Sequence, residues 1–180
     1  MKFPPNYKLI FFLIGLCFFT GISAQVHDKF WRNIIDTKDD VWYQSDEAKQ
    51  IAENVLLYQR NIGGWPKNVQ MHLPLSQDEK EQLLKQKQTN EETTTDNGAT
   101  IQEMLFLSKI YAQTKDERYR KAFLKGLDYI LEAQYDNGGW PQFYPLKEGY
   151  YSRITYNDNS MVNIMNMLHQ FKKNTDYYSI

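Results

Sequence analysis

The sequence Gly-Gly-Trp-Pro occurs twice in this chain, at residues 63–66 and 138–141. Glycine permits backbone conformations that a Cβ disfavours, and proline fixes φ and lacks an amide donor, so no helix can run through either segment. A glutamine precedes each copy, and these glutamines, Gln59 and Gln134, are 75 positions apart. The chain must therefore turn sharply at two related places.

An Asp-Asn pair follows each turn, at residues 96–97 and 158–159. Together the motifs divide the chain into two related units, each with a helix, a turn, a variable connection and an Asp-Asn pair that opens the next helix. Such repeats are typical of stacked helical hairpins whose equivalent loops gather at one end. We therefore expect the two Asp-Asn pairs to meet, with their carboxylates within roughly 10 Å of each other.

Apolar residues recur at helical spacing through most of the chain after residue 44. The expected helices begin near Ser45, Ser76, Asp96 or Asn97, Asp116, and Asp158 or Asn159. Residues 89–95 are expected to form a polar loop, and no segment shows the alternation and clear boundaries of a strand. The sequence predicts an all-α protein of antiparallel helical hairpins, which either close into a toroid or stack as a solenoid.

The amino terminus has the layout of a secretory signal peptide. Lys2 and Lys8 precede an apolar run at residues 9–19, and small residues precede Gln25. We expect cleavage after Ala24, a secreted or periplasmic protein, and no stable membrane anchor. The alternative is an anchored amino-terminal helix, although the apolar run is short for a span of about 20 residues.

The remainder divides into a leader, residues 25–44, and one partial catalytic domain, residues 45–180. Loss of Lys2 and Lys8 with the signal peptide changes the formal charge from −1 to −3. This balance, without a basic stripe, argues against nucleic acid as a partner. The single cysteine, Cys17, lies in the signal peptide, so the exported protein would carry no thiol to oxidise.

Asp96 and Asp158 stand at equivalent helix starts, where an aspartate ordinarily caps the helix by accepting backbone N–H bonds. The functional alternative is a metal site, because each aspartate is followed by an asparagine, Asn97 or Asn159. Two converging Asp-Asn pairs would supply the hard oxygen ligands that calcium prefers. Both interpretations stay open on the sequence alone.

Polar and aromatic residues beside the turns are candidates for ligand binding. Lys67, Asn68 and Arg153 lie near the turns, where cations can bind an acidic sugar, although each is more often a solvated surface residue. The aromatic residues of the second turn, Trp140 among them, can stack on the apolar side of a sugar ring or pack against neighbouring helices.

Several long motifs, in order, resemble those of polysaccharide lyase family 10, the pectate lyases with a helical toroid-like fold. The matching segments are residues 61–68, 95–100, 125–129, 133–146 and 154–163. The resemblance covers roughly residues 40–173. It implies that the hairpins form part of an (α/α) toroid-like barrel.

The resemblance also implies an activity, the calcium-assisted cleavage of α-1,4-linked polygalacturonate by β-elimination. A cation on the uronate carboxylate stabilises the charge that develops when the C5 proton leaves. By resemblance, Asp96 and Asp158 would be catalytic, Asp96, Asn97 and Asp158 would line the calcium site, and Trp65, Lys67, Asn68 and Trp140 would shape the groove.

The chain departs from the family pattern in one respect. Family members use an arginine as the base that takes the C5 proton, and it belongs to a later part of the domain, beyond Ile180. Arg153 does not align with that arginine. We therefore expect a carboxy-terminal truncation, in which activity of this chain alone stays open.

Two other functions remain possible at this stage. A second resemblance is to the Gln-Trp repeat of terpene cyclases, which are helical toroids too, and it is carried by Lys125, Gly126, Leu131, Gln134, Gly138 and Trp140. A signal peptide and the lack of an acidic diphosphate-binding motif argue against a cyclase. The other alternative is a non-catalytic helical fragment that binds uronans.

Overall fold

The structure is a computed structural model that describes residues 30–34, 38–154, 156 and 159–173. Its α-helices are α3 (Asp46–Tyr58), α4 (Gln77–Gln86), α5 (Ile101–Thr114), α6 (Glu117–Glu132) and α7 (Ser160–Lys173). Its short 3₁₀ helices are η1 (Trp31–Asn33), η2 (Trp42–Gln44), η3 (Asp96–Gly98) and η4 (Tyr150–Ser152). Within the described ranges there is no strand, only two isolated β-bridges, so the predicted all-α class is confirmed.

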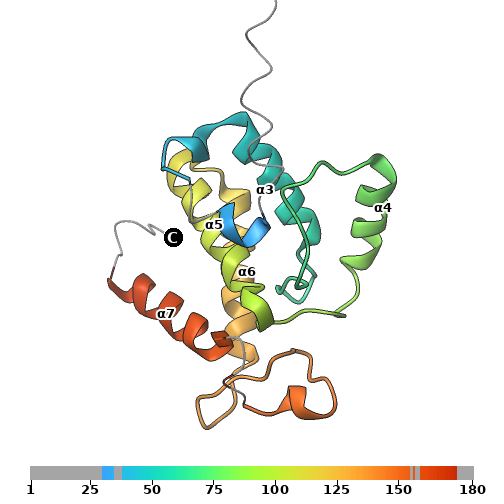
Figure 1. Ribbon diagram of the computed structural model, residues 1–180, viewed down its shortest axis with the longest axis vertical. Coiled ribbons are helices and arrows are strands. Elements are labelled where there is room, and N and C mark those ends of the chain that lie inside the picture. The colour runs from blue at the N-terminus through green and yellow to red at the C-terminus, as the bar shows by residue number, and fades with distance from the viewer. Residues whose placement is uncertain (1–29, 35–37, 155, 157–158, 174–180) are drawn as a thin grey trace, which may run out of the picture.

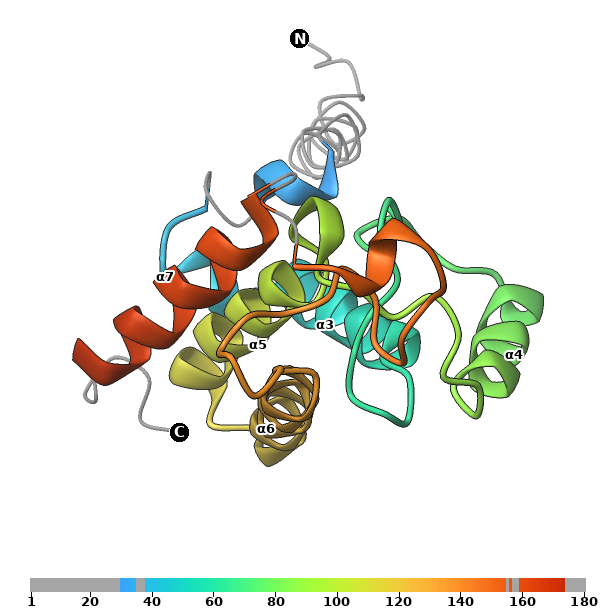
Figure 2. The ribbon, with the colours of Figure 1, turned by 90° about the horizontal axis from the view of Figure 1, so that it is seen from below.

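Helices α5 and α6 form an antiparallel hairpin at the centre of the molecule (Figure 1). The hairpin turns at Lys115, which has a left-handed φ of 57°. Helix α3 packs beside both helices, while α7 and α4 lie on opposite sides of this central group (Figures 1 and 2). The largest fully buried side chains, which fill the core, include Trp65, Tyr43, Tyr119, Tyr129, Phe106, Ile34, Met104, Ile110 and Ile130.

Three of the predicted helix starts are confirmed by side-chain caps. Ser45 accepts the backbone N–H of Ala48 at 3.1 Å, and Asp116 accepts that of Arg118 at 2.9 Å. Ser76 opens α4 with a capping box, in which its side chain and that of Glu79 each accept a backbone N–H of the other residue. Each cap satisfies a backbone donor that the first turn of a helix leaves unpaired. These boundaries therefore follow from local sequence.

Helix α5 begins later than predicted. Asn97 and Thr100 have left-handed φ values of 53° and 66°, which separate η3 from α5 and move the helix start to Ile101. The N-cap is Thr100, and it makes no side-chain capping bond. The interpretation of Asp96 as an ordinary helix cap is therefore wrong, since Asp96 lies in η3 and not at the start of α5.

The segment expected to be a leader contributes to the core, beginning at Trp31. Trp31, Ile34 and Tyr43 are all buried. The Trp31 and Tyr43 rings contact Phe106 of α5, with centroids 5.1 Å and 5.7 Å away. Aromatic burial of this size is a large apolar contribution, so this segment is part of the folded unit.

The two Gly-Gly-Trp-Pro turns have matching hydrogen bonds. Each glutamine side chain donates to the carbonyl of the first glycine of its turn, at 2.9 Å for Gln59 and 3.0 Å for Gln134. The residue after each glutamine donates its backbone N–H to the carbonyl of the second glycine, at 3.0 Å and 2.8 Å. The first glycines, Gly63 and Gly138, have φ values of 110° and 86°, which explains the need for glycine there.

In the part of the chain that the structure describes, no helix combines the length and apolar character needed to cross a membrane. The predicted signal peptide, residues 1–24, lies outside the described residues.

Candidate functional site

The segment 93–96 lies between the two turns and is hydrogen-bonded to both. Its Thr94 donates its backbone N–H to the carbonyl of Trp65 at 3.2 Å, and Thr95 donates to that of Gln142 at 3.1 Å. The hydroxyl of Thr94 also donates to the carbonyl of Gln142. These bonds bring the first turn, the second turn and the first Asp-Asn pair to one place. The predicted polar loop is in fact buried here, because its threonines supply the donors that join the turns.

Asp96 is the last residue of this segment and is almost fully buried, at 4% exposure. Its backbone N–H donates to the Thr94 hydroxyl at 3.0 Å, which fixes the residue. Lys67 donates from Nζ to Oδ2 of Asp96 in a close ion pair. The other carboxylate oxygen, Oδ1, is buried and has no hydrogen-bond partner among the described residues.

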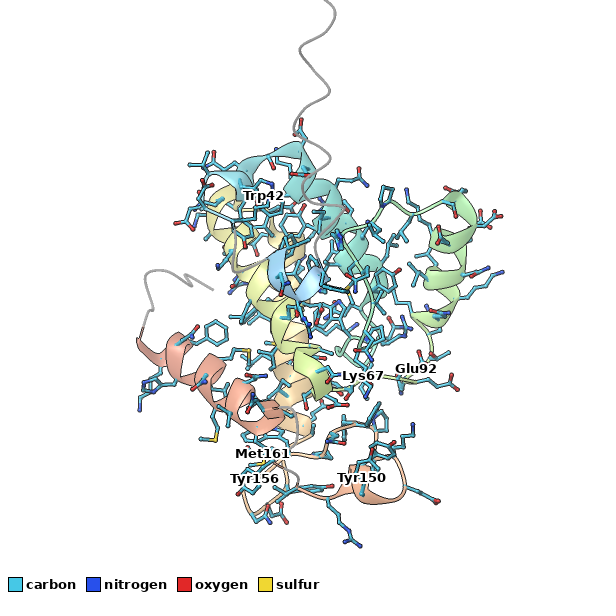
Figure 3. All side chains as sticks on the ribbon, viewed as in Figure 1. Trp42, Lys67, Glu92, Tyr150, Tyr156 and Met161 are labelled. Atoms are coloured by element: carbon cyan, nitrogen blue, oxygen red, sulfur yellow. The ribbon has the colours of Figure 1, made fainter. Side chains whose placement is uncertain are left out.

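Two asparagines complete this group. Asn97 donates from Nδ2 to Oδ1 of Asn68 at 3.1 Å, and both side chains are exposed. Asn68 and Asn97 have left-handed φ values of 61° and 53°, which asparagine tolerates better than most residues. Four predicted site residues thus come together, and we call Lys67, Asn68, Asp96 and Asn97 the Lys67–Asp96 corner. Lys67 is labelled in Figure 3, to the right of the lower end of the central helices.

The two tryptophans lie in the core instead. Trp65 is fully buried and Trp140 is 5% exposed. Each indole donates from Nε1 to a carbonyl ten positions earlier, at 2.8 Å from Trp65 to Val55 and at 2.8 Å from Trp140 to Ile130. A buried ring offers no face to a sugar, so the expectation that both rings shape the groove is corrected. They lock each turn onto the helix that precedes it.

The second Asp-Asn pair is described only in part, because Asp158 lies outside the described residues. Ser160, the first residue of α7, is buried, and its hydroxyl lies 2.6 Å from the hydroxyl of Thr95. The start of α7 is thus tied to the residue that precedes Asp96. Arg153 is exposed, and no ion pair joins its side chain to another described residue.

A cleft of about 350 Å³ adjoins the Lys67–Asp96 corner. Its lining includes Lys67, Asn68 and Asn97 from the corner, together with Trp31, Arg32, Gln102 and Glu103. We call this the η1 cleft. Its volume is within the range of small-ligand pockets, about 300–1,000 Å³.

Glu103 is a buried carboxyl group that the sequence reasoning missed. It is 2% exposed, and its Oε1 accepts the Trp31 indole N–H at 2.7 Å. Burial raises the pKa of Glu103 to about 7, while the Trp31 bond and backbone donors lower it in part. One signal could have found it, since Glu103 is an acidic residue inside a helix that is otherwise too apolar to be exposed.

Across the residues that the structure describes, no three histidine, cysteine or acidic side chains gather as a metal-binding group. The expected calcium site includes Asp158, so its full ligand set falls outside the described residues.

Residues 59–179 match the model of a protein family described as pectic acid lyase. Two solved structures are also similar, a family 10 polysaccharide lyase from Cellvibrio cellulosa and a mutant of that lyase in complex with trigalacturonic acid. For both, the sequence identity is 31%, the TM-score is 0.62, and 83% of this chain is covered. The search of curated proteins found no match.

This chain spans about two fifths of those lyases, 41% of the unmutated protein and 42% of the mutant. The match agrees with the prediction that the helical hairpins form part of an (α/α) toroid-like barrel.

Proposed function

Because the chain belongs to the pectic acid lyase family, we propose that its Lys67–Asp96 corner binds polygalacturonate and takes part in cleavage by β-elimination. The relative solved with trigalacturonic acid is one support for a uronate ligand. The position of the corner is the other, because it lies where the two repeated turns meet. The residues gathered there are charged or polar and differ from the buried tryptophans of the same turns.

The carboxylate of Asp96 is the observation that carries the proposal. Removing a carboxylate from water costs several kcal/mol, so buried carboxylates usually have every oxygen paired. Asp96 pairs one oxygen with Lys67 and leaves Oδ1 without a hydrogen-bond partner among the described residues. A purely structural ion pair does not explain this unpaired oxygen. A ligand or cation bound at Oδ1 would explain it.

The oxygen ligands available at this place suit calcium. Oδ1 of Asp96 is a hard oxygen without a hydrogen-bond partner among the described residues, and the next residue, Asn97, carries a side-chain amide oxygen. Asp96, Asn97 and Asp158 would hold the ion, and the Thr95–Ser160 contact supports the approach of the second Asp-Asn pair. When bound, calcium supplies positive charge beside the uronate carboxylate, which makes the C5 proton more acidic.

The side chains of the corner then bind and orient the sugar. The Lys67 ammonium has three donors and gives one to Asp96, so the others are left for a uronate carboxylate. The Nδ2 group of Asn68 makes no hydrogen bond with a described residue, so it can donate to a sugar hydroxyl. Arg153 is proposed as a further contact with substrate, as an exposed cation on the loop before α7.

The test compares the full chain with an Asp96→Asn variant, which keeps the shape and removes the charge. Binding of trigalacturonate in the presence of calcium, measured by titration calorimetry, is expected to weaken at least tenfold. Asp128→Asn, at an exposed position on α6, is the matched control and should bind as the wild type does. Equal affinity of the Asp96→Asn variant would contradict the proposed site.

Cleavage is measured on the same samples through the ultraviolet absorbance of unsaturated uronate. Calcium-dependent absorbance that Asp96→Asn abolishes supports a lyase. Binding without any product favours the alternative of a non-catalytic uronan-binding chain.

We also propose that the chain is exported, on the basis of its amino-terminal charge and apolar pattern. Amino-terminal sequencing of the expressed protein is expected to begin at Gln25. Recovery of intact protein that starts at Met1 from the cell envelope would overturn this proposal.

A further inference from the structure

The η1 cleft extends from the Lys67–Asp96 corner to residues that the proposed function does not use. Its far wall is η1, which lies outside the range matched by the family model, residues 59–179. The charged side chains that line the cleft are Arg32, Lys67 and Glu103. Two cations thus line the cleft, from segments far apart in the sequence.

The wall that carries Arg32 is held firmly in place. The Trp31 backbone N–H donates to Oε1 of Gln70 at 2.7 Å, and its indole N–H donates to Glu103 at 2.7 Å. The Trp31 ring is 4% exposed and packs edge-on against Phe106. Because its neighbour is anchored in this way, Arg32 has a fixed position at the cleft rather than on a loose end.

Arg32 is available to bind an anion. Its guanidinium is exposed, lies 5.5 Å from the centroid of the Phe30 ring, and forms no ion pair with a described residue. The acidic group of the cleft, Glu103, is mostly protonated at pH 6 and below, because burial raises its pKa to about 7. A carboxylate entering at mildly acid pH therefore meets positive charge without an opposing anion.

The cleft also has unpaired polar atoms. Nε2 of Gln102 is buried and has no partner among the described residues. Oε2 of Glu103, in a side chain that is 2% exposed, is unpaired as well. Buried polar groups without partners are uncommon, and at the edge of a cleft they favour a ligand rich in hydroxyl groups.

We propose that the η1 cleft holds a second uronate unit of a longer oligosaccharide, beside the Lys67–Asp96 corner, and that Arg32 binds the carboxylate of this unit and Gln102 a hydroxyl group. This inference rests on the proposed function, because it places the unit next to the one held by the Lys67–Asp96 corner. Arginine suits this role, since its planar guanidinium can make two parallel hydrogen bonds to a carboxylate. Charge recognition at this subsite would select free uronate over its methyl ester.

The test measures affinity at pH 6 for trigalacturonate and for its fully methyl-esterified form, with the full chain and the Arg32→Gln variant. Arg32→Gln is expected to weaken binding of the acid about tenfold and to leave binding of the ester unchanged, because only the acid offers a carboxylate. Arg120→Gln is the matched control, since Arg120 lies on α6 and pairs only with Glu117 there, at 3.6 Å. Circular dichroism of each variant confirms that helix content is retained.

The possible outcomes separate the two proposals. If Asp96→Asn weakens binding of the acid and Arg32→Gln does not, the subsite is wrong and the proposed function stands. If Arg32→Gln weakens acid and ester equally, Arg32 does not recognise the carboxylate and the subsite is wrong. If the wild type binds neither ligand, with or without calcium, the proposed function fails and this inference fails with it.

Discussion

The two Gly-Gly-Trp-Pro turns have the same local hydrogen bonds and very different surroundings. Gln59 of the first turn is 4% exposed, whereas Gln134 of the second is exposed. A Cβ added at Gly63 would lie 2.2 Å from the carbonyl oxygen of Lys125 on α6. A Cβ added at Gly138 would meet nothing within 4 Å among the described residues.

This difference separates the local structure that the repeated sequence determines from the packing that the rest of the fold contributes. The turn itself is local, because its bonds join a glutamine to glycines four residues later in both copies. The first turn is also covered by tertiary packing against α6. The Gln59 side chain contributes to this packing by donating a second hydrogen bond, 2.8 Å long, to the Ala122 carbonyl of α6. Four predictions test whether the turns are alike in their local bonds and unlike in their packing.

Of the four changes, removal of a turn tryptophan should lower the free energy of unfolding the most. The loss should be similar in the two turns. Trp65→Ala and Trp140→Ala each delete a buried ring and are expected to lower the free energy of unfolding by about 3–5 kcal/mol. Urea denaturation followed by circular dichroism measures this. Trp→Phe at the same positions keeps most of the apolar volume and should cost less. A loss of under about 1 kcal/mol for Trp140→Ala would show that the second turn is not locked as the first is.

A pH change should act mainly on the first turn. Glu103 lies one helical turn after Thr100, whose hydroxyl accepts the backbone N–H of Trp65 at 3.0 Å. Because its pKa in the folded state, about 7, lies above its ordinary value of 4.5, the folded protein holds this proton more tightly than the unfolded chain does. The resulting stability is full below pH 4.5 and is lost as the pH rises through 7, by about 3 kcal/mol.

Denaturation midpoints at pH 4.5 and pH 8 measure this loss. Glu103→Gln should remove it, whereas Glu132→Gln, at an exposed position on α6, should not. When the pH is raised from 4.5 to 8, the backbone amide of Gly63 should lose more protection from hydrogen exchange than that of Gly138, after correction for intrinsic exchange rates. Equal changes at the two amides would count against the link through Thr100.

Alanine at the first glycine should separate the two turns most directly. Gly63→Ala adds a methyl group against the Lys125 backbone and also strains a φ of 110°, so we expect a cost of about 2–4 kcal/mol. Gly138→Ala strains only its φ of 86° and should cost about 1–2 kcal/mol. Thermal unfolding of the two variants measures the difference. Equal costs would show that α6 does not press on the first turn.

Loss of the glutamine side chains should give the smallest effects. Gln59→Ala leaves two buried carbonyls, of Gly63 and Ala122, without their donor, at a cost of about 1–3 kcal/mol. Gln134→Ala removes one exposed bond and should stay within about 0.5 kcal/mol of the wild type. A larger cost at Gln134 than at Gln59 would reverse the comparison.

Local sequence was sufficient to predict much of the fold. The caps at Ser45, Ser76 and Asp116, and the two turns, depend on bonds within a few residues of each other. The start of α5 could not be predicted, because the left-handed conformations of Asn97 and Thr100 depend on bonds to other segments. Thr100 donates its hydroxyl to the Thr94 carbonyl and accepts the Trp65 N–H, 35 residues away in the sequence.

The sequence predicted which residues belong to the candidate site better than it predicted how they are arranged in space. Lys67, Asn68, Asp96 and Asn97 were named from motifs, and the structure brings them together. Burial of Trp65 and Trp140 could not be told from the sequence, since an aromatic turn residue suits a sugar face and a core equally. Glu103 and Arg32 were missed because their role comes from a wall, η1, that no motif links to α5.

The segment 93–96 has one further consequence. Its bonds reach back to Trp65 and forward to Gln142, so the site exists only when parts of the chain more than 70 residues apart are assembled. The unfolded chain therefore has no competing affinity for ligand, and every bound molecule shifts the unfolding equilibrium by mass action. At a free ligand concentration 100 times Kd the gain is about 2.7 kcal/mol, so the melting temperature of this chain serves as a binding assay that requires no turnover.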